Sequence, residues 1–341
     1  MRNTEINRNR RRTVNSRGMV MVEPLPNLER YRHGSESTLK WECVFMLPAW
    51  LSVWWTHFGR RTETSLFVVK HGEEIYGIAP LVLNGETARL VSDSDLIDYS
   101  DFITAPSKNK AFFEILFSHL RQEGITRVDI PRVRSDSSAV SCLNTYSSAL
   151  ACHVSCSPVD MLYEMALPDT WEAYLGLLTG TERHEIRRKI RRLEGAGNVG
   201  LRVIENLKDV SHEMDTFIKL FRSNRPEKAE FMSSAVESFF RTLAREMAEA
   251  GLLKLFLLDL NGMPVAAVMC FDYDSTFYLY NNGYDRQFTH LSVGLLSKVF
   301  SVQEGIKRGR KKYNFLRGSE EYKGRLGGRP VRLLHCEVNL R

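Results

Sequence analysis

The sequence has 341 residues, more than a single hydrophobic core usually organises, so two domains are expected. Its hydrophobic content of 43% is typical of a soluble globular protein, and no apolar run approaches the roughly 20 residues that cross a membrane. The formal net charge of +6 lies mostly in residues 1–18, where six arginines accompany a single glutamate. The rest of the chain therefore gives little reason to expect stable nucleic-acid binding, and we predict a disordered basic tail over residues 1–22.

The cysteines are scattered along the chain, and no apolar segment of the secretory kind follows the charged N-terminus. Both features favour free thiols and a cytoplasmic location. The fragment Cys152-His153-x-x-Cys156 lacks a second pair of ligands at a suitable spacing, so we predict no metal site. The six cysteines are at positions 43, 142, 152, 156, 270 and 336.

The first half of the sequence is rich in strands, with helices between the later ones, which is typical of an α/β domain. A helix is predicted to begin at Pro48, and two strands flank the turn at His71–Glu74. We place this first domain at residues 40–167. Its predicted strands are 66–70, 75–83, 88–91, 101–104, 127–130 and 159–167, and its further helices are 111–121 and 137–150.

The second domain is predicted over residues 168–341. A long helical pattern covers Thr170–Glu194, and an Asn261-Gly262 turn joins two strands in a hairpin. We expect both domains to have mixed, mostly antiparallel sheets flanked by helices. The remaining predicted elements are strands at 199–205, 252–260, 265–271, 276–280, 312–316 and 333–340, and helices at 210–222, 235–250 and 293–306.

The stretch Thr276–Gly328 has the order strand, loop, helix, strand, basic loop. Ser292 is a plausible N-cap of the helix, and the N–H groups of its first turn have no intrahelical partner, so they can bind a pyrophosphate. In the basic loop, Lys323 could neutralise a phosphate, and the hydroxyl of Tyr322 could protonate a leaving thiolate. The predicted cofactor-binding residues, which would contact this pyrophosphate, are Ser292, Val293, Gly294, Leu295 and Lys323.

Three strings of this stretch, Tyr280–Asp285, Leu291–Leu296 and Tyr313–Gly318, carry a family resemblance, joined upstream by Asp98–Phe102 and Arg183–Lys189. The chain resembles the acetyltransferase-like group associated with cellulose and other exopolysaccharide synthesis, within the GNAT superfamily and related to the Fem peptidoglycan-bridge transferases. The resemblance covers roughly residues 50–340. It implies two tandem GNAT-type acyltransferase-like domains, with strands that splay near Asn281 and expose backbone to the acyl donor.

An acidic loop in the first half provides the candidate base. Clustered carboxylates repel one another, which raises the pKa of one of them toward that of a general base, although turn-forming aspartates in a solvated loop would look the same. Asp98 is our predicted catalytic residue together with Tyr322. The loop carries Asp93, Asp95, Asp98 and Asp101. The predicted substrate-binding residues are Tyr99, Asp101, Asn281, Tyr284, Arg317 and Glu320.

A basic helical run at residues 183–192 has two interpretations. Its arginines could dock phosphates through bidentate contacts, or they could form a solvated face balanced by glutamates.

The resemblance implies an acyltransferase that moves an acyl group from acyl-CoA, acetyl-CoA in particular, to an amine or hydroxyl of a sugar or envelope or exopolysaccharide precursor. Direct attack needs alignment and oxyanion stabilisation, without a metal or a covalent intermediate. The donor loop has only Gly294 where the superfamily has a second small residue, so an aminoacyl-tRNA-dependent, Fem-like transferase is an alternative. A non-catalytic binding module of polysaccharide assembly is another. The expected partners are a small-molecule or saccharide acceptor and the polysaccharide-synthesis machinery.

Overall fold

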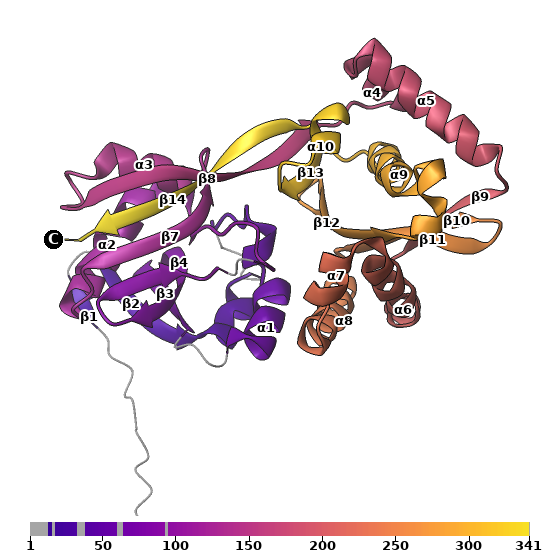
Figure 1. The fold of residues 1–341 in the computed structure, drawn as a ribbon. Helices are drawn as coiled ribbons and strands as arrows, with labels where there is room; N and C mark the ends of the chain where they lie inside the picture. Colours follow the sequence, from indigo (N-terminus) through magenta and orange to yellow (C-terminus); the bar gives the residue numbers. More distant parts are fainter. Residues whose placement is uncertain (1–12, 16–17, 33–37, 60–63, 93–94, 341) are drawn as a thin grey trace, which may run out of the picture. The chain divides into compact units, whose positions relative to one another are not determined.

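The computed structural model describes residues 13–15, 18–32, 38–59, 64–92 and 95–340, which form two compact units (Figure 1). Unit 1 comprises the described residues up to Val159 together with the C-terminal segment that begins at Leu333. Unit 2 is Asp160–Arg332. The predicted second domain, 168–341, therefore differs from unit 2 at both ends. The physical reason is strand pairing, because the C-terminal strand forms an antiparallel ladder with a strand of unit 1.

Unit 1 contains a mixed sheet in the strand order β1-β2-β3-β4-β5-β7-β14, in which β5 and β7 are parallel and the other paired neighbours described are antiparallel. Its strands are β1 (Thr13–Asn15), β2 (Gly18–Pro24), β3 (Thr64–His71), β4 (Glu74–Asn84), β5 (Thr87–Leu90), β6 (Ile103–Thr104), which pairs with β4, and β7 (Arg127–Arg134), with parts of β8 (His153–Ala166) and β14 (Arg329–Asn339). Its helices are η1 (Leu25–Tyr31), η2 (Val44–Met46), α1 (Pro48–His57), η4 (Pro106–Lys108), α2 (Asn109–Gln122) and α3 (Ser138–Tyr146).

The apolar face of α2 covers the sheet of unit 1. Phe112, Phe113 and Phe117 are fully buried in the same cluster as the inward side chains of the strands. Strand β2 pairs along its length with β3, so residues 18–22 are ordered rather than part of a disordered tail. This corrects the predicted tail at its C-terminal end; residues 1–12 and 16–17 lie outside the described residues.

Unit 2 has the strand order β8-β13-β12-β11-β10-β9, with β12 and β13 parallel and the other pairs antiparallel. Its further strands are β9 (Val199–Ile204), β10 (Leu253–Leu260), β11 (Met263–Tyr273), β12 (Thr276–Tyr284) and β13 (Lys312–Arg317). Its helices are α4 (Trp171–Leu177), α5 (Gly180–Glu194), α6 (Leu207–Asn224), α7 (Pro226–Phe231), α8 (Ser234–Glu249), η5 (Arg286–Leu291), α9 (Val293–Lys307) and α10 (Glu321–Arg325).

Helices cover both faces of the sheet in unit 2. Every residue of β10 is buried, as expected for a strand with helices on both sides. Helix α9 packs on one face, with α4 and α5 outside it, and α6 to α8 pack on the opposite face (Figure 1). The predicted α/β fold with mixed sheets flanked by helices is confirmed.

The long helix predicted over Thr170–Glu194 is two helices, α4 and α5. Leu178 is extended, and Thr179 then caps α5, accepting a hydrogen bond from the backbone N–H of Glu182 while the Glu182 carboxylate accepts from the backbone N–H of Thr179. This capping box is a start signal that was present in the sequence.

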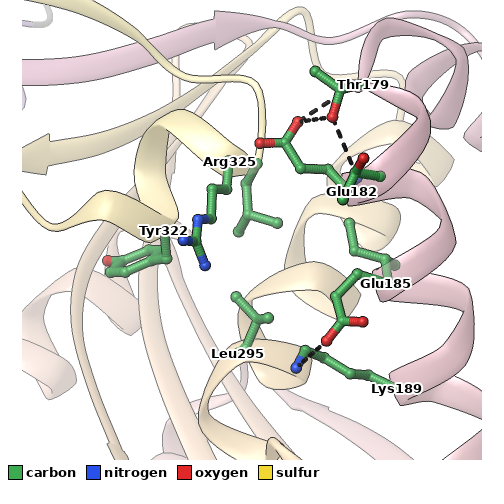
Figure 2. A pocket seen from close by; sticks show the side chains of 10 residues that line it. Thr179, Glu182, Glu185, Lys189, Leu295, Tyr322 and Arg325 are labelled. Atoms are coloured by element: carbon green, nitrogen blue, oxygen red, sulfur yellow. Dashed lines mark hydrogen bonds and ion pairs between the residues drawn. The ribbon is translucent and has the colours of Figure 1, made fainter.

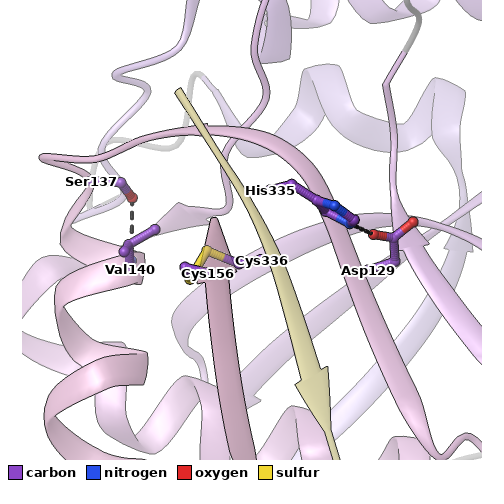
Figure 3. Close-up of a disulfide and its surroundings, with 6 residues drawn as sticks. All are labelled: Asp129, Ser137, Val140, Cys156, His335 and Cys336. Atoms are coloured by element: carbon purple, nitrogen blue, oxygen red, sulfur yellow. Dashed lines mark hydrogen bonds and ion pairs between the residues drawn. A yellow bond between two sulfur atoms is a disulfide. The ribbon is translucent and has the colours of Figure 1, made fainter. Parts of the chain in front are cut away.

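Cys156 of β8 and Cys336 of β14 form a disulfide within unit 1 (Figure 3). The prediction of six free thiols is therefore wrong for this pair, because strands that are neighbours in the sheet bring together residues 180 positions apart in the chain. Disulfides are typical of oxidising compartments, so the cysteines no longer support the predicted cytoplasmic location. The free cysteines are Cys43, Cys142, Cys152 and Cys270.

None of the helices that the structure describes combines the length and the apolar character needed to cross a membrane.

Candidate functional site

The parallel strands β12 and β13 diverge in the middle of unit 2. Their paired positions run only from Thr276 to Tyr278 on β12, although that strand continues to Tyr284. Each strand also has a register shift on its other edge, between Leu279 and Asn281 in β12 and between Asn314 and Leu316 in β13. Such bulges bend a strand and turn its edge away from a neighbour. The splay implied by the family resemblance is present, and Asn281 lies on it.

Close packing from the α6 face fixes the path of β12 through the splay. A side chain at Gly283 would place its Cβ 2.3 Å from the backbone nitrogen of Phe221, so only glycine lets α6 approach this closely. The ring of Tyr280 lies between Phe240 and Phe271, with centroid separations of 5.6 and 5.3 Å. The bulge is therefore held by aromatic packing.

The start of α9 differs from the prediction in two respects, at Ser292 and at Gly294. Ser292 precedes the helix in a left-handed conformation, and its side chain makes no capping hydrogen bond; its carbonyl accepts from the N–H groups of Leu295 and Leu296. A Cβ at Gly294 would lie 2.5 Å from the ring of Tyr284. The space beside Gly294 is therefore filled by an aromatic ring, and not by the opening for a phosphate that the sequence predicted.

A pocket of about 440 Å³ lies between α5 on one side and α10 with the first turn of α9 on the other (Figure 2). Its charged side chains have partners in the protein. Lys189 lies 2.7 Å from Glu185, and Arg325 lies 2.5 Å from Glu321. The lining residues are Thr179, Thr181, Glu182, Glu185, Ile186, Lys189, Leu295, Tyr322, Arg325 and Leu326.

Lys298 of α9 is a buried cation next to this pocket, only 6% exposed. Its Nζ donates to the carbonyl of Gly294 at 2.6 Å and lies 4.9 Å from the ring centre of Tyr322. Burial, followed by the positive charge of Lys228, lowers the pKa of Lys298 to about 7. Tyr322 lines the pocket and also contacts Lys298, so it joins the pocket to the cationic group.

Lys228 comes from α7, on the opposite face of the sheet. Its Nζ donates to the carbonyl of Asn282 on the splayed part of β12 and lies 4.5 Å from the ring centre of Phe221. Burial, followed by the nearby charge of Arg225, lowers the pKa of Lys228 to about 8.

Lys323 of α10 is 2% exposed and uses its ammonium group within the protein. It donates to the carbonyls of Leu316, Arg317 and Gly318 at 3.2, 2.5 and 3.3 Å, and its Nζ lies 2.9 Å from the Glu320 carboxylate. Since an ammonium group has three donors, these contacts account for all of them. Lys323 therefore stabilises the loop after β13. It has no donor left for the phosphate contact that was predicted from the sequence.

The other predicted residues of unit 2 surround the same loop. Burial raises and Lys323 lowers the pKa of Glu320, with a net lowering, and the carboxylate stays 55% exposed. The guanidinium Nε of Arg317 lies 3.9 Å from Asp160. Burial raises the pKa of Tyr322 far above its ordinary value, so the hydroxyl remains protonated and can donate.

The acidic loop belongs to unit 1, so its residues are described apart from those of unit 2. Tyr99 is 2% exposed and packs edge-to-face on Phe45 at 5.3 Å, which makes it a core residue rather than the substrate contact predicted. Asp101 accepts a hydrogen bond from its neighbour's backbone N–H at 2.8 Å, and burial raises its pKa to about 7. Asp98 is partly exposed, and its catalytic role stays a prediction; Asp93 lies outside the described residues.

The sequence analysis missed Lys228 and Lys298. For Lys298 the sequence contained a signal. This charged residue lies beside Leu295 and Val299, two residues of the predicted apolar face of the helix. Lys228 lies on a short helix that the apolar pattern did not predict. In the described part of the chain, no three His, Cys, Asp or Glu side chains lie close enough to hold a metal ion.

Residues 181–324, within unit 2, match the family model of the acetyltransferase (GNAT) domain. Searched against curated proteins, the sequence gives no match. Among solved structures, the chain is similar to FemX, with a TM-score of 0.61, 12% identity and coverage of 92% of this chain and 94% of FemX.

Two further solved structures are similar. One is a protein of unknown function from Bacteroides thetaiotaomicron, with a TM-score of 0.59, 13% identity and coverage of 93% of this chain and 97% of that one. The other is the C-terminal domain of a putative lysylphosphatidylglycerol synthetase from Agrobacterium fabrum, with a TM-score of 0.53, 10% identity and coverage of 81% and 84%. At these identities the similarity shows the fold. Residues 181–324, the part that matches the acetyltransferase (GNAT) domain model, include the splayed strands β12 and β13.

Proposed function

We propose that the protein transfers an acyl group from acyl-CoA, acetyl-CoA in particular, to an amine or hydroxyl of an acceptor by direct attack. The observation that carries this proposal is the divergence of β12 and β13 in the same unit as the α5–α10 pocket, whose lining residue Tyr322 packs edge-to-face on Phe315 of β13. A donor whose arm occupies the pocket would extend its thioester toward the splay. The apolar side chains of Ile186, Leu295 and Leu326 suit a pantetheine-like arm, and the volume suits a small ligand.

The chemistry follows from the groups at the splay. Beyond Tyr278, the edge of β12 that faces β13 has no ladder partner among the described residues. Apart from the carbonyls of Asn282 and Tyr284, which accept from Lys228 and Ser223, its backbone groups would align the donor. Tyr322 is protonated, so its hydroxyl would donate a hydrogen bond to the leaving thiolate. Asp98, in unit 1, remains our proposed base for the acceptor. Replacing Asp98 by Asn would then reduce turnover with an unchanged melting temperature.

The acceptor proposed is a sugar or a precursor of an envelope polysaccharide or exopolysaccharide. This part rests on the resemblance of Tyr280–Asp285, Leu291–Leu296 and Tyr313–Gly318 to the group associated with cellulose and exopolysaccharide synthesis. It also carries the proposal of the polysaccharide-synthesis machinery as a partner.

An aminoacyl-tRNA donor is the second candidate. The fold similarity to FemX and to a lysylphosphatidylglycerol synthetase domain is compatible with it. On α5, Arg187 and Arg188 are paired with Glu172 and Glu185, as a solvated face requires, whereas the exposed Arg191 has no ion-pair partner among the described residues. A helix with remaining positive charge could contact a nucleic-acid backbone.

Donor-dependent thermal stabilisation separates these candidates. At 100 times its Kd, a bound donor stabilises the folded state by about 2.7 kcal/mol. Leu295→Glu would put a charge into the pocket, and Leu207→Glu is the matched control, since Leu207 is 42% exposed at the start of α6. We expect acetyl-CoA to raise the melting temperature of the parent and of Leu207→Glu, but not of Leu295→Glu.

Other outcomes assign the protein differently. Stabilisation by aminoacyl-tRNA and by no acyl-CoA would favour the Fem-like transferase. Stabilisation by neither donor would favour a non-catalytic binding module of polysaccharide assembly.

A further inference from the structure

Positive side chains outnumber negative ones around the splay of unit 2. Lys228, Lys298 and Lys323 come from α7, α9 and α10, and Arg225 precedes α7. Lys298 interacts electrostatically with the other three, and the carboxylate in the group is Glu320. The polar neighbours Tyr322 and Cys270 are protonated at neutral pH, because burial raises the pKa of both. The group therefore carries an excess of positive charge.

Two of these lysines retain a donor. Lys298 has one hydrogen bond, to Gly294, and one contact with the face of an aromatic ring, and Lys228 has the same combination with Asn282 and Phe221. Because an ammonium group has three N–H donors, each lysine has at least one that is not accounted for by a described protein group. Lys323, in contrast, uses all three.

Solvent reaches the edge of the group. Arg225 is exposed, and no ion-pair partner for it is found within the described residues. Glu320 is 55% exposed, so the ion pair that it makes with Lys323 also borders on solvent. The rim of the group is therefore open to solvent at Arg225 and Glu320, and Lys228 is itself half-buried.

We propose that Lys228 and Lys298, with Arg225 at the rim, bind a carboxylate or phosphate group of the acceptor substrate, so that the acceptor is acidic. The free N–H donors of a buried ammonium group are best satisfied by charge-assisted hydrogen bonds to an oxyanion. The assignment to the acceptor, rather than to the donor, rests on the proposed function, in which the donor occupies the α5–α10 pocket. Lys228 belongs to the opposite face of the sheet, away from that pocket.

The geometry has a measurable consequence. Burial and the charge of Lys228 lower the pKa of Lys298 to about 7, and burial and the charge of Arg225 lower the pKa of Lys228 to about 8. A bound anion favours the charged form of both lysines, so binding at pH 8 should take up protons from solution. A site made of ordinary, fully protonated lysines would take up none.

The experiment is titration calorimetry at pH 8 with acetate and inorganic phosphate as separate probes, each in two buffers of different ionisation enthalpy. We expect binding of at least one probe with uptake of about one proton. The probe that binds more tightly identifies the acidic group. Lys298→Met and Lys228→Met should each weaken binding at least tenfold. Lys307→Met is the control, because Lys307 is 79% exposed on the same helix α9.

Two further arms distinguish this site from a site of ordinary lysines and from a donor site. Lys228→Arg keeps a charge that cannot be removed, so it should keep most of the binding and reduce the proton uptake. The probe should bind equally to the protein saturated with acetyl-CoA. Absence of binding by both probes, binding without proton uptake, or equal binding by Lys298→Met would overturn the proposal. Competition between the probe and acetyl-CoA would assign the anion to the donor, which also overturns it, whereas failure of acetyl-CoA to bind concerns only the proposed function.

Discussion

Replacing Lys298 by Met tests the energetic reasoning about the site, because the cost of burying this ammonium group can be worked out. Its pKa is lowered from 10.5 to about 7, and one pKa unit corresponds to about 1.4 kcal/mol. At pH 7 the burial of Lys298 therefore destabilises the folded state by about 4 kcal/mol. Methionine has a similar shape without the charge. It loses the hydrogen bond to Gly294 and the contact with Tyr322, about 1 kcal/mol each.

We therefore expect Lys298→Met to be about 2 kcal/mol more stable than the parent at pH 7. The sign changes with pH. The folded pKa of Lys298 lies below the unfolded value, so between pH 7 and 10.5 the unfolded chain binds more protons, and parent stability rises with pH. Near pH 10 the advantage of the variant should disappear.

The assay is urea unfolding at pH 7 and pH 10, followed by pulsed hydrogen exchange of peptides from α9, which reports unit 2 separately. Lys307→Met is the control, and it should change stability by less than about 0.5 kcal/mol at both pH values, as exposed sites usually do. A destabilised Lys298→Met with no dependence on pH would refute the reasoning, since it would mean that Lys298 is charged and fully satisfied in the folded state.

Three more predictions concern single contacts. Gly294→Ala should destabilise unit 2 by about 1–3 kcal/mol in urea unfolding, because the new Cβ would meet Tyr284; unchanged stability would contradict this packing. The pKa of Asp101 is raised to about 7, so between pH 4 and 7 the folded protein keeps a proton on this carboxyl that the unfolded chain releases, and the stability of the parent falls as pH rises. Asp101→Asn should therefore be about 1–2 kcal/mol more stable than the parent at pH 8 but not at pH 4. Reductant should lower the stability of unit 1 by about 2–5 kcal/mol in thermal melts, and Cys156→Ser, which cannot form the bond to Cys336, should not respond to it.

Much of the fold could be predicted because it depends on local patterns. The turn at Asn261-Gly262 identified the hairpin of β10 and β11, and the apolar face of α9 identified its helix. The return of β14 to unit 1 and the pairing of Cys156 with Cys336 could not be predicted. Both depend on which strands become neighbours, and the sequence around each residue carries no signal of that choice.

The site was predicted in outline and not in its contacts. The splay at Asn281 followed from the family resemblance, and Tyr322 was singled out by its hydroxyl in the basic loop. The predicted role of Gly294 did not account for the ring of Tyr284. That ring comes from the end of another strand and meets the glycine only in the folded protein.

Lys323 and Lys298 show why residue type alone misassigns a site such as this one. Both are buried lysines of unit 2, and the sequence favoured Lys323 because it lies in a basic loop with glycines. In the folded protein the carbonyls of Leu316, Arg317 and Gly318 accept the hydrogen bonds of Lys323, so its charge holds the loop. Lys298 has one carbonyl and one ring as partners, and burial, followed by the positive charge of its neighbours, lowers its pKa. A ligand gains most from a hydrogen-bond donor that has no partner in the protein. The geometry therefore points to Lys298, and to Lys228 on the opposite face of the sheet, as the residues of unit 2 that bind the substrate.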